Sequence, residues 1–219
     1  MSLGERLLRA VLDHPKDDRP RLVYADWLEE QDDPRGELIR VQLRLHQKCC
    51  PQVLKGLRAR DRELRRRHAV TWLGRVMPRL TGWEFRRGFV DEVTLKAHVY
   101  LGPARELLDR EPVRCVRMSR ATGNFSALAG SSLLARLAEL DLSRNHLNDA
   151  AVAELTASPH LERLRALRLA YNFIRESGAL LLADCPQLGN LRLLDLSGNF
   201  LSAAAKTALR DRFGGAVRF

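Results

Sequence analysis

Leu137-Ala-Glu-Leu140-Asp-Leu142-Ser-Arg-Asn145 is the stretch of sequence that decides the fold, because its pattern returns twice. The second copy is Leu164-Arg-Ala-Leu167-Arg-Leu169-Ala-Tyr-Asn172, and the third is Leu191-Arg-Leu-Leu194-Asp-Leu196-Ser-Gly-Asn199. Each copy has the form Leu-x-x-Leu-x-Leu-x-x-Asn, and 27 residues separate Leu140 from Leu167 and Leu167 from Leu194. A constant period in this range indicates stacked copies of one structural unit.

Two weaker copies precede these three. One has Val90, Val93 and Leu95 at the apolar positions, with His98 where the others have Asn. The next has Val113, Val116 and Met118, with Ala121 at the Asn position. We therefore expect five strands over residues 90–219, the first two belonging to atypical terminal repeats. Residues 216–219 are a candidate for a short closing strand.

The pattern predicts a strand that turns into a helix. Positions 4 and 6 of a copy, such as Leu140 and Leu142, point to the same side of a strand and are expected to face inward. A buried Asn at position 9 can bond backbone groups that the turn leaves unpaired, which predicts a structural ladder of Asn145, Asn172 and Asn199. Alanine-rich helices are expected over 150–155, 179–183 and 203–209. The fold class is therefore α/β.

The three full copies resemble the leucine-rich repeats of the ribonuclease-inhibitor type. That resemblance implies a solenoid with a parallel sheet on its concave side and helices on its convex side. It also implies that the concave sheet binds a protein, so that the domain is a non-catalytic interaction module. About five repeats make a short arc.

Residues 1–48 are expected to form a small helical module. Apolar residues recur at helical spacing in residues 3–13, and Pro20 can open a second helix in which Leu22, Val23, Trp27 and Leu28 would be buried. A third helix is expected after the turn at 32–36. The string Arg21-Leu-Val-Tyr-Ala-Asp-Trp-Leu-Glu-Glu30, followed by Asp33-Pro-Arg-Gly-Glu37, is similar to the repeat-companion domain of bacterial repeat proteins. That resemblance implies no reaction.

Tyr24, Asp26 and Trp27 suggest two interpretations. They could form a binding site, or the two aromatic residues could anchor a small core while Asp26 pairs with an Arg. The second interpretation is favoured, because small helical units need large side chains to fold.

Residues 49–89 are a basic connector and N-terminal cap. Of the net charge of +10, this segment contributes +8, from eleven Lys and Arg and three Asp and Glu. One or two helices are expected over 53–81, followed by residues 82–89 leading into the first repeat strand. An alternative function, polyanion (nucleic acid) binding, is assigned to Arg58, Arg62, Arg65 and Arg66 on this helix. No helix-turn-helix, zinc-finger or aromatic RNA-binding motif supports it, and a solvated helix face is favoured.

The sequence predicts no catalytic, metal or cofactor site. None of the six histidines has a recognisable catalytic or zinc-binding setting, and no phosphate-binding glycine motif is present. No apolar run is long enough for a membrane span, and no signal peptide is recognised. A cytoplasmic protein is expected, in which Cys49, Cys50, Cys115 and Cys185 are reduced thiols.

Alternation along the strands predicts two exposed columns on the sheet. Position 5 gives Thr94, Arg117, Asp141, Arg168 and Asp195, and position 8 gives Ala97, Arg120, Arg144, Tyr171 and Gly198. Arg117, Asp141, Arg168 and Asp195 alternate in sign, which predicts a ladder of cross-strand ion pairs of about 0.2–1 kcal/mol each. The candidate protein-binding residues are Arg117, Arg120, Arg144, Arg168 and Tyr171, and Tyr and Arg are the side chains typical of interface hot spots.

Overall fold

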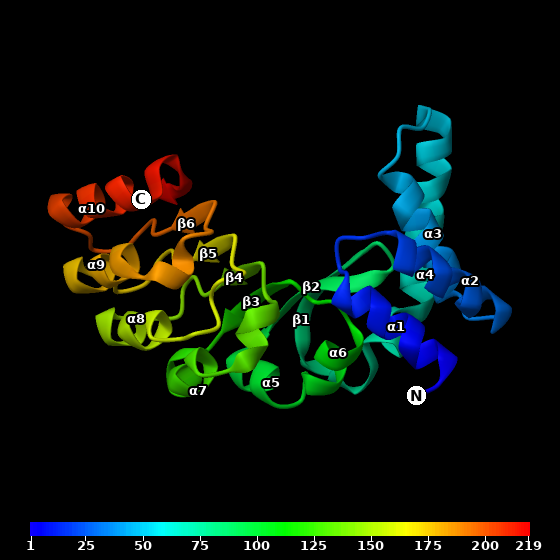
Figure 1. Ribbon diagram of the computed structural model, residues 1–219, viewed down its shortest axis with the longest axis horizontal. Coiled ribbons are helices and arrows are strands. Elements are labelled where there is room, and N and C mark those ends of the chain that lie inside the picture. The colour runs from blue at the N-terminus through cyan, green and yellow to red at the C-terminus, as the bar shows by residue number, and fades with distance from the viewer. The chain divides into compact units, whose positions relative to one another are not determined.

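The computed structural model describes residues 1–219 and has an α/β architecture (Figure 1). Ten α-helices accompany a seven-stranded sheet of order β1-β2-β3-β4-β5-β6-β7, which is mostly parallel. Contacts divide the chain into two compact units. The first unit comprises Met1–Pro78, Trp83–Asp91 and Glu106–Pro112, and the second comprises Arg79–Gly82, Glu92–Arg105 and Val113–Phe219. None of the helices combines the length and the apolar character needed to cross a membrane.

Four helices make up most of the first unit: α1 (Leu3–Asp13), α2 (Arg19–Glu30), α3 (Arg35–Leu45) and α4 (Pro51–Leu73). Ser2 begins α1 with a capping box, in which its hydroxyl accepts from the Glu5 N–H and the Glu5 carboxylate accepts from the Ser2 N–H. Pro20 and Pro51 stand in the first turns of α2 and α4, where a missing N–H costs nothing.

The core of the first unit is built around aromatic rings. Trp27 and Tyr24 stack at 5.8 Å, and Tyr24 also stacks on Phe89 at 6.1 Å. These rings pack against a buried apolar cluster made of Val11, Ala25, Leu28, Ile39, Leu43 and Phe89. The expected burial of Leu22 and Val23 is wrong, because their side of α2 faces solvent while Ala25 and Leu28 face the core.

A β-hairpin follows α4, and it corrects the helical assignment of residues 80–81. After a 3₁₀ turn (Gly74–Arg79), strand β1 runs over Leu80–Arg86 and β2 over Phe89–Lys96. Arg87 and Gly88 join them with φ values of 55° and 84°, the two left-handed conformations that a type I′ hairpin turn requires. A Cβ at Gly88 would lie 2.1 Å from a side-chain carbon of Ile39, so glycine also permits this close approach.

The second unit repeats one parallel strand after another in strict register. The strands are β3 (Cys115–Ser119), β4 (Glu139–Asp141), β5 (Ala166–Arg168), β6 (Leu193–Asp195) and β7 (Val217–Arg218). Leu140 pairs with Leu167, and Leu167 pairs with Leu194, so positions 27 residues apart become neighbours. These three leucines are fully buried, as the alternation predicted.

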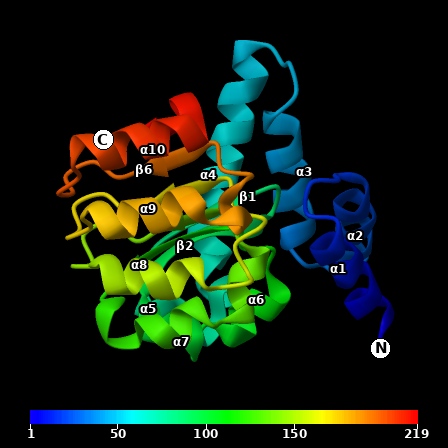
Figure 2. The same ribbon diagram turned by 60° about the vertical axis from the view of Figure 1, so that its left-hand side comes forward.

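Helices cover one side of these strands, as Figures 1 and 2 both show. The helices of the second unit are α5 (Ala97–Leu101), α7 (Phe125–Ala129), α8 (Asp149–Thr156), α9 (Glu176–Asp184) and α10 (Ala203–Phe213), while α6 (Arg105–Arg110) belongs largely to the first unit. Within the second unit α7, α8, α9 and α10 pack side by side in chain order. Ala97 does not belong to the exposed position-8 column, because it begins α5 and is completely buried.

Asparagine side chains tie each strand-to-helix turn to the preceding one. The Asn172 carbonyl oxygen accepts from the N–H groups of Asn145 and Leu147, both at 3.0 Å. Its amide nitrogen donates to the carbonyls of Leu142, Leu169 and Ala170. Asn145 and Asn199 make equivalent bonds toward the turns that precede them in the chain, so the three side chains satisfy backbone groups of successive repeats.

Replacing Asn172 with Ala should therefore destabilise the second unit strongly. The change leaves two buried N–H donors without an acceptor, each costing about 1–3 kcal/mol, so we expect a loss of about 3–5 kcal/mol in chemical denaturation. Asn190→Ala is the matched control, because Asn190 is exposed and its side chain makes a single bond, to the Glu162 carbonyl. Equal unfolding midpoints for the two variants would show that the asparagine does not hold the turns.

Candidate functional site

The turns at the ends of the repeat strands share an unusual backbone conformation. Arg120, Arg144, Tyr171 and Gly198 occupy position 8 of four successive repeats, with φ values of 53°, 59°, 54° and 70°. Only glycine adopts this left-handed conformation without steric cost, which for other residues is about 1–2 kcal/mol. Three of the four positions nevertheless carry large exposed side chains. Strain of this kind is found where a side chain is needed for function.

Tyr171 is held between its two neighbours in this column. The guanidinium of Arg144 lies 4.3 Å from the centre of the Tyr171 ring, within cation–π distance. On the other side the ring covers Gly198, where an added Cβ would lie 2.6 Å from a ring carbon. The ring is 56% exposed yet fixed in place.

A second column of rings follows the asparagines. His146, Phe173 and Phe200 each come directly after a ladder Asn, and each ring contacts the next: Phe173 and Phe200 stack, and His146 lies tilted against Phe173. The centres of His146 and Phe173 are 5.5 Å apart, and those of Phe173 and Phe200 are 6.2 Å apart at an interplanar angle of 14°. We call Arg144, His146, Tyr171, Phe173 and Phe200 the aromatic surface. This column was not predicted from the sequence, although the Asn-aromatic pairs recur at 172–173 and 199–200.

The backbone N–H groups of the three exposed aromatic residues are all hydrogen-bonded. Tyr171 donates its N–H to the Ser197 carbonyl at 2.7 Å, Phe173 to Leu147 at 2.7 Å and Phe200 to Ile174 at 2.9 Å. Phe173 and Phe200 are nevertheless 49% and 62% exposed. Large apolar side chains thus stand on rigid turns and remain accessible to a partner.

The position-5 column forms one of its expected ion pairs. Strand register places Arg117, Asp141, Arg168 and Asp195 side by side, and Arg117 Nε lies 2.8 Å from the Asp141 carboxylate. The rest of the predicted ladder is wrong: Arg168 pairs with Glu139, two residues earlier on the neighbouring strand. Asp195 instead accepts the N–H of Ser197 at 3.0 Å. Asp141 caps Ser143 in the same way and still pairs with Arg117, so it is the engagement of Arg168 by Glu139 that leaves Asp195 without an ion pair.

The Arg-rich helix α4 separates into paired and unpaired cations. Arg60 binds Glu37 and Glu63, Arg65 binds Asp61 and Glu84, and Arg67 binds Glu63. The remaining exposed cations, without an acidic partner, lie on one stripe of the helix; they are Lys55, Arg58, Arg62 and Arg66. Of the residues proposed for polyanion binding, Arg65 is thus already neutralised.

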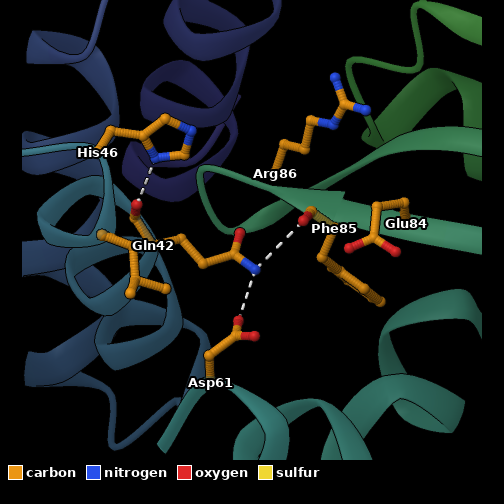
Figure 3. Close-up of a pocket in the computed structure, with 7 residues that line it drawn as sticks. Gln42, His46, Asp61, Glu84, Phe85 and Arg86 are labelled. Atoms are coloured by element: carbon orange, nitrogen blue, oxygen red, sulfur yellow. Dashed lines mark hydrogen bonds between the residues drawn. The ribbon is translucent and has the colours of Figure 1, made fainter. Parts of the chain in front are cut away.

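The first unit contains a pocket of about 320 Å³ whose lining side chains are joined by hydrogen bonds that hold the fold together (Figure 3). The Gln42 amide points into it from α3 and donates to Asp61 at 2.7 Å and to the Phe85 carbonyl at 3.2 Å. Its oxygen accepts the Gly88 N–H at 2.7 Å. The amide joins α3, α4 and the hairpin, and both of its N–H groups are used in these structural bonds.

The remaining candidates take structural positions. Asp26 pairs with Arg40, which also binds Glu29, while Tyr24 and Trp27 pack on the core. All four cysteines are free, and burial raises the pKa of the Cys185 thiol. No group of three or more His, Cys, Asp or Glu side chains is placed to hold a metal ion.

Comparison with other proteins adds no assignment. No protein-family model matches this chain, and no curated protein matches its sequence.

Asp141 should make stability depend on pH. Burial raises its pKa, but the N–H and hydroxyl of Ser143 and the Arg117 guanidinium outweigh burial, so the pKa lies below the ordinary value. The charged Asp141 carboxylate therefore stabilises the folded state at pH values above about 3.9, the pKa of this group in the unfolded chain. This stabilisation is lost as pH falls through the folded pKa.

The test is Asp141→Asn, which should be less stable than the wild type by about 1 kcal/mol at pH 7. The difference should shrink in denaturant titrations below about pH 4. Asp195→Asn is the control, because Asp195 has no ion pair and its replacement should cost less. A difference that stays constant from pH 7 to pH 3 would contradict the proposed role of the charge.

Proposed function

We propose that the second unit is a leucine-rich-repeat solenoid and that the protein is a non-catalytic module which binds a protein partner. What supports the solenoid is the register of β3 to β6 at the sequence period, together with the asparagine bonds between successive turns. On this proposal the first unit corresponds to a repeat-companion domain, and the protein acts in the cytoplasm.

The single observation that carries the binding function is the aromatic surface. Three of its rings, Tyr171, Phe173 and Phe200, are about half exposed, and the backbone N–H of each of these residues is hydrogen-bonded. Rigid aromatic side chains lose little entropy on binding, and Tyr and Arg dominate hot spots. An exposed aromatic cluster marks an interaction site better than scattered apolar residues do.

The binding residues shift relative to the sequence proposal. Arg117 and Arg168 are engaged with Asp141 and Glu139, and a partner would have to compete with those carboxylates. We therefore assign recognition to Arg120, Arg144 and Tyr171 together with the stacked rings of Phe173 and Phe200.

A second candidate function, polyanion binding, rests on the free cations of α4. Lys55, Arg58, Arg62 and Arg66 recur every three or four residues, which aligns them on one face of the helix. Four cations in a row can contact several phosphates of a nucleic acid strand. This function would use a different unit and would not require the aromatic surface.

Glycine substitutions test the protein-binding function without breaking the fold. The triple variant combines Arg120→Gly, Arg144→Gly and Tyr171→Gly. Glycine relieves the backbone strain at these left-handed positions but also gives the unfolded chain more conformational freedom. Because the two effects oppose each other, the free energy of unfolding should stay within about 2 kcal/mol of the wild type. In pull-downs from the source cells, the wild type should retain a specific partner and the variant should lose it. Arg163→Ala is the control, an exposed cation that precedes β5. Equal recovery by both proteins would remove this surface from consideration.

Polyanion binding predicts a steep salt dependence. If three or four phosphates are contacted, affinity for a mixed-sequence oligonucleotide should fall with log salt at a slope of about −3. Arg58→Gln, Arg62→Gln and Arg66→Gln combined should flatten the slope, while Arg163→Gln should leave it unchanged. No retention of the oligonucleotide in a filter-binding titration at low salt would exclude this function.

A further inference from the structure

We propose that the aromatic surface binds an acidic peptide segment that also carries apolar side chains. This deepens the protein-binding function proposed above and rests on it. The chemistry of the partner follows from three features: which parts of the rings are accessible, which charges are free and how rigid the turns are.

Ring geometry favours a peptide over nucleobases. Phe173 and Phe200 stack nearly parallel with their ring centres 6.2 Å apart, and the His146 ring lies 5.5 Å from Phe173 at a tilt of 31°. A nucleobase stacks about 3.4 Å from each neighbouring ring, so two rings must be about 6.8 Å apart to admit a base between them. The Phe173 and Phe200 centres are closer than this, at 6.2 Å. The accessible ring edges carry partial positive charge, which suits carboxylates and aliphatic groups.

Free charge on the same face is positive. Arg120 and Arg144 are exposed and make no ion pair. The strand carboxylates are already engaged, since Asp141 binds Arg117, Glu139 binds Arg168 and Asp195 caps the Ser197 N–H. A partner that supplied carboxylates to Arg120 and Arg144 would complete the charge balance of the surface, whereas a basic partner would meet repulsion.

The size and rigidity of the surface fit a short extended segment. Adjacent parallel strands lie about 4.8 Å apart, so the position-8 column from Arg120 to Gly198 spans about 14 Å, or four to five residues of extended peptide at about 3.4 Å each. Arg144 and Gly198 fix the Tyr171 ring before binding, which lowers the entropy lost on association. In a peptide segment with one or two carboxylates beside Leu or an aromatic residue, the carboxylates would bind Arg120 and Arg144 of the position-8 column. The apolar side chain would pack on the rings of Phe173 and Phe200.

The test uses the full chain and a phage-displayed library of random 12-residue peptides. Panning should enrich peptides that combine Asp or Glu with Leu, Phe or Trp. Synthetic copies labelled with fluorescein should bind in anisotropy titrations, with Kd raised at least tenfold by Tyr171→Gly or Arg144→Gly. Exchange of the peptide's Asp and Glu for Asn and Gln should also weaken binding at least tenfold. Arg163→Ala, which removes one exposed positive charge elsewhere in the second unit, should change Kd less than twofold.

The outcomes separate the two levels of the proposal. Neutral or basic peptides that depend on Tyr171 would overturn the acidic partner and leave protein binding at this surface intact. Enriched peptides that tolerate both glycine variants, or no enrichment at all, would overturn the surface as a peptide site. Binding of fluorescein-labelled oligo(dT) that is lost in Tyr171→Gly would overturn the peptide in favour of nucleic acid. Thermal melting of each variant distinguishes loss of binding from loss of folding.

Discussion

The hydrogen bonds from the asparagine side chains to the backbone are the constraint on which the second unit depends. The strands β4, β5 and β6 are only three residues long, so their ladder bonds alone hold little of the chain. Asn145 and Asn172 extend that order into the turns, because each bonds backbone groups of its own repeat and of the one before. A buried amide with these bonds is costly to displace, which keeps successive repeats in one register.

The same constraint produces the candidate binding surface. Because the Asn must point inward, the residues on either side of it point outward, and these are Arg144 and His146 in one repeat and Tyr171 and Phe173 in the next. The turn also requires a left-handed residue immediately before the Asn, which is where Gly198 stands. The fold and the proposed binding function therefore depend on adjacent residues of one turn: the Asn bonds the backbone, and its neighbours present exposed side chains.

The features of the fold that could be predicted from the sequence are those that follow from the local spacing of apolar residues. The strands, the alanine-rich helices and the register followed from leucine spacing, since burial repeats with the period of the chain. Strand β1 was missed because Leu80–Arg86 lacks the leucine motif and pairs through a hairpin turn. The burial of Leu22 and Val23 was misjudged because α2 buries Ala25 and Leu28 on its other side. The pairing of Arg168 with Glu139 was not predicted, because it depends on the direction in which the long Arg168 side chain extends. The spacing of residues along the sequence does not determine that direction.

The distribution of arginines shows why net charge alone could not assign a function. In the first unit Arg35 is partly buried, lies 4.6 Å from the centre of the Phe89 ring and binds the buried Glu111 at 2.6 Å. Burial raises the pKa of Glu111, while Arg35 and the Val90 N–H favour its charged form. Arg60, Arg65 and Arg67 are likewise committed to carboxylates. Only cations without such a partner are free to recognise a ligand, and they include the exposed stripe of α4 and Arg120 and Arg144 of the position-8 column. Only the second combines them with fixed, exposed aromatic rings, and for that reason it is the stronger candidate for recognising a protein.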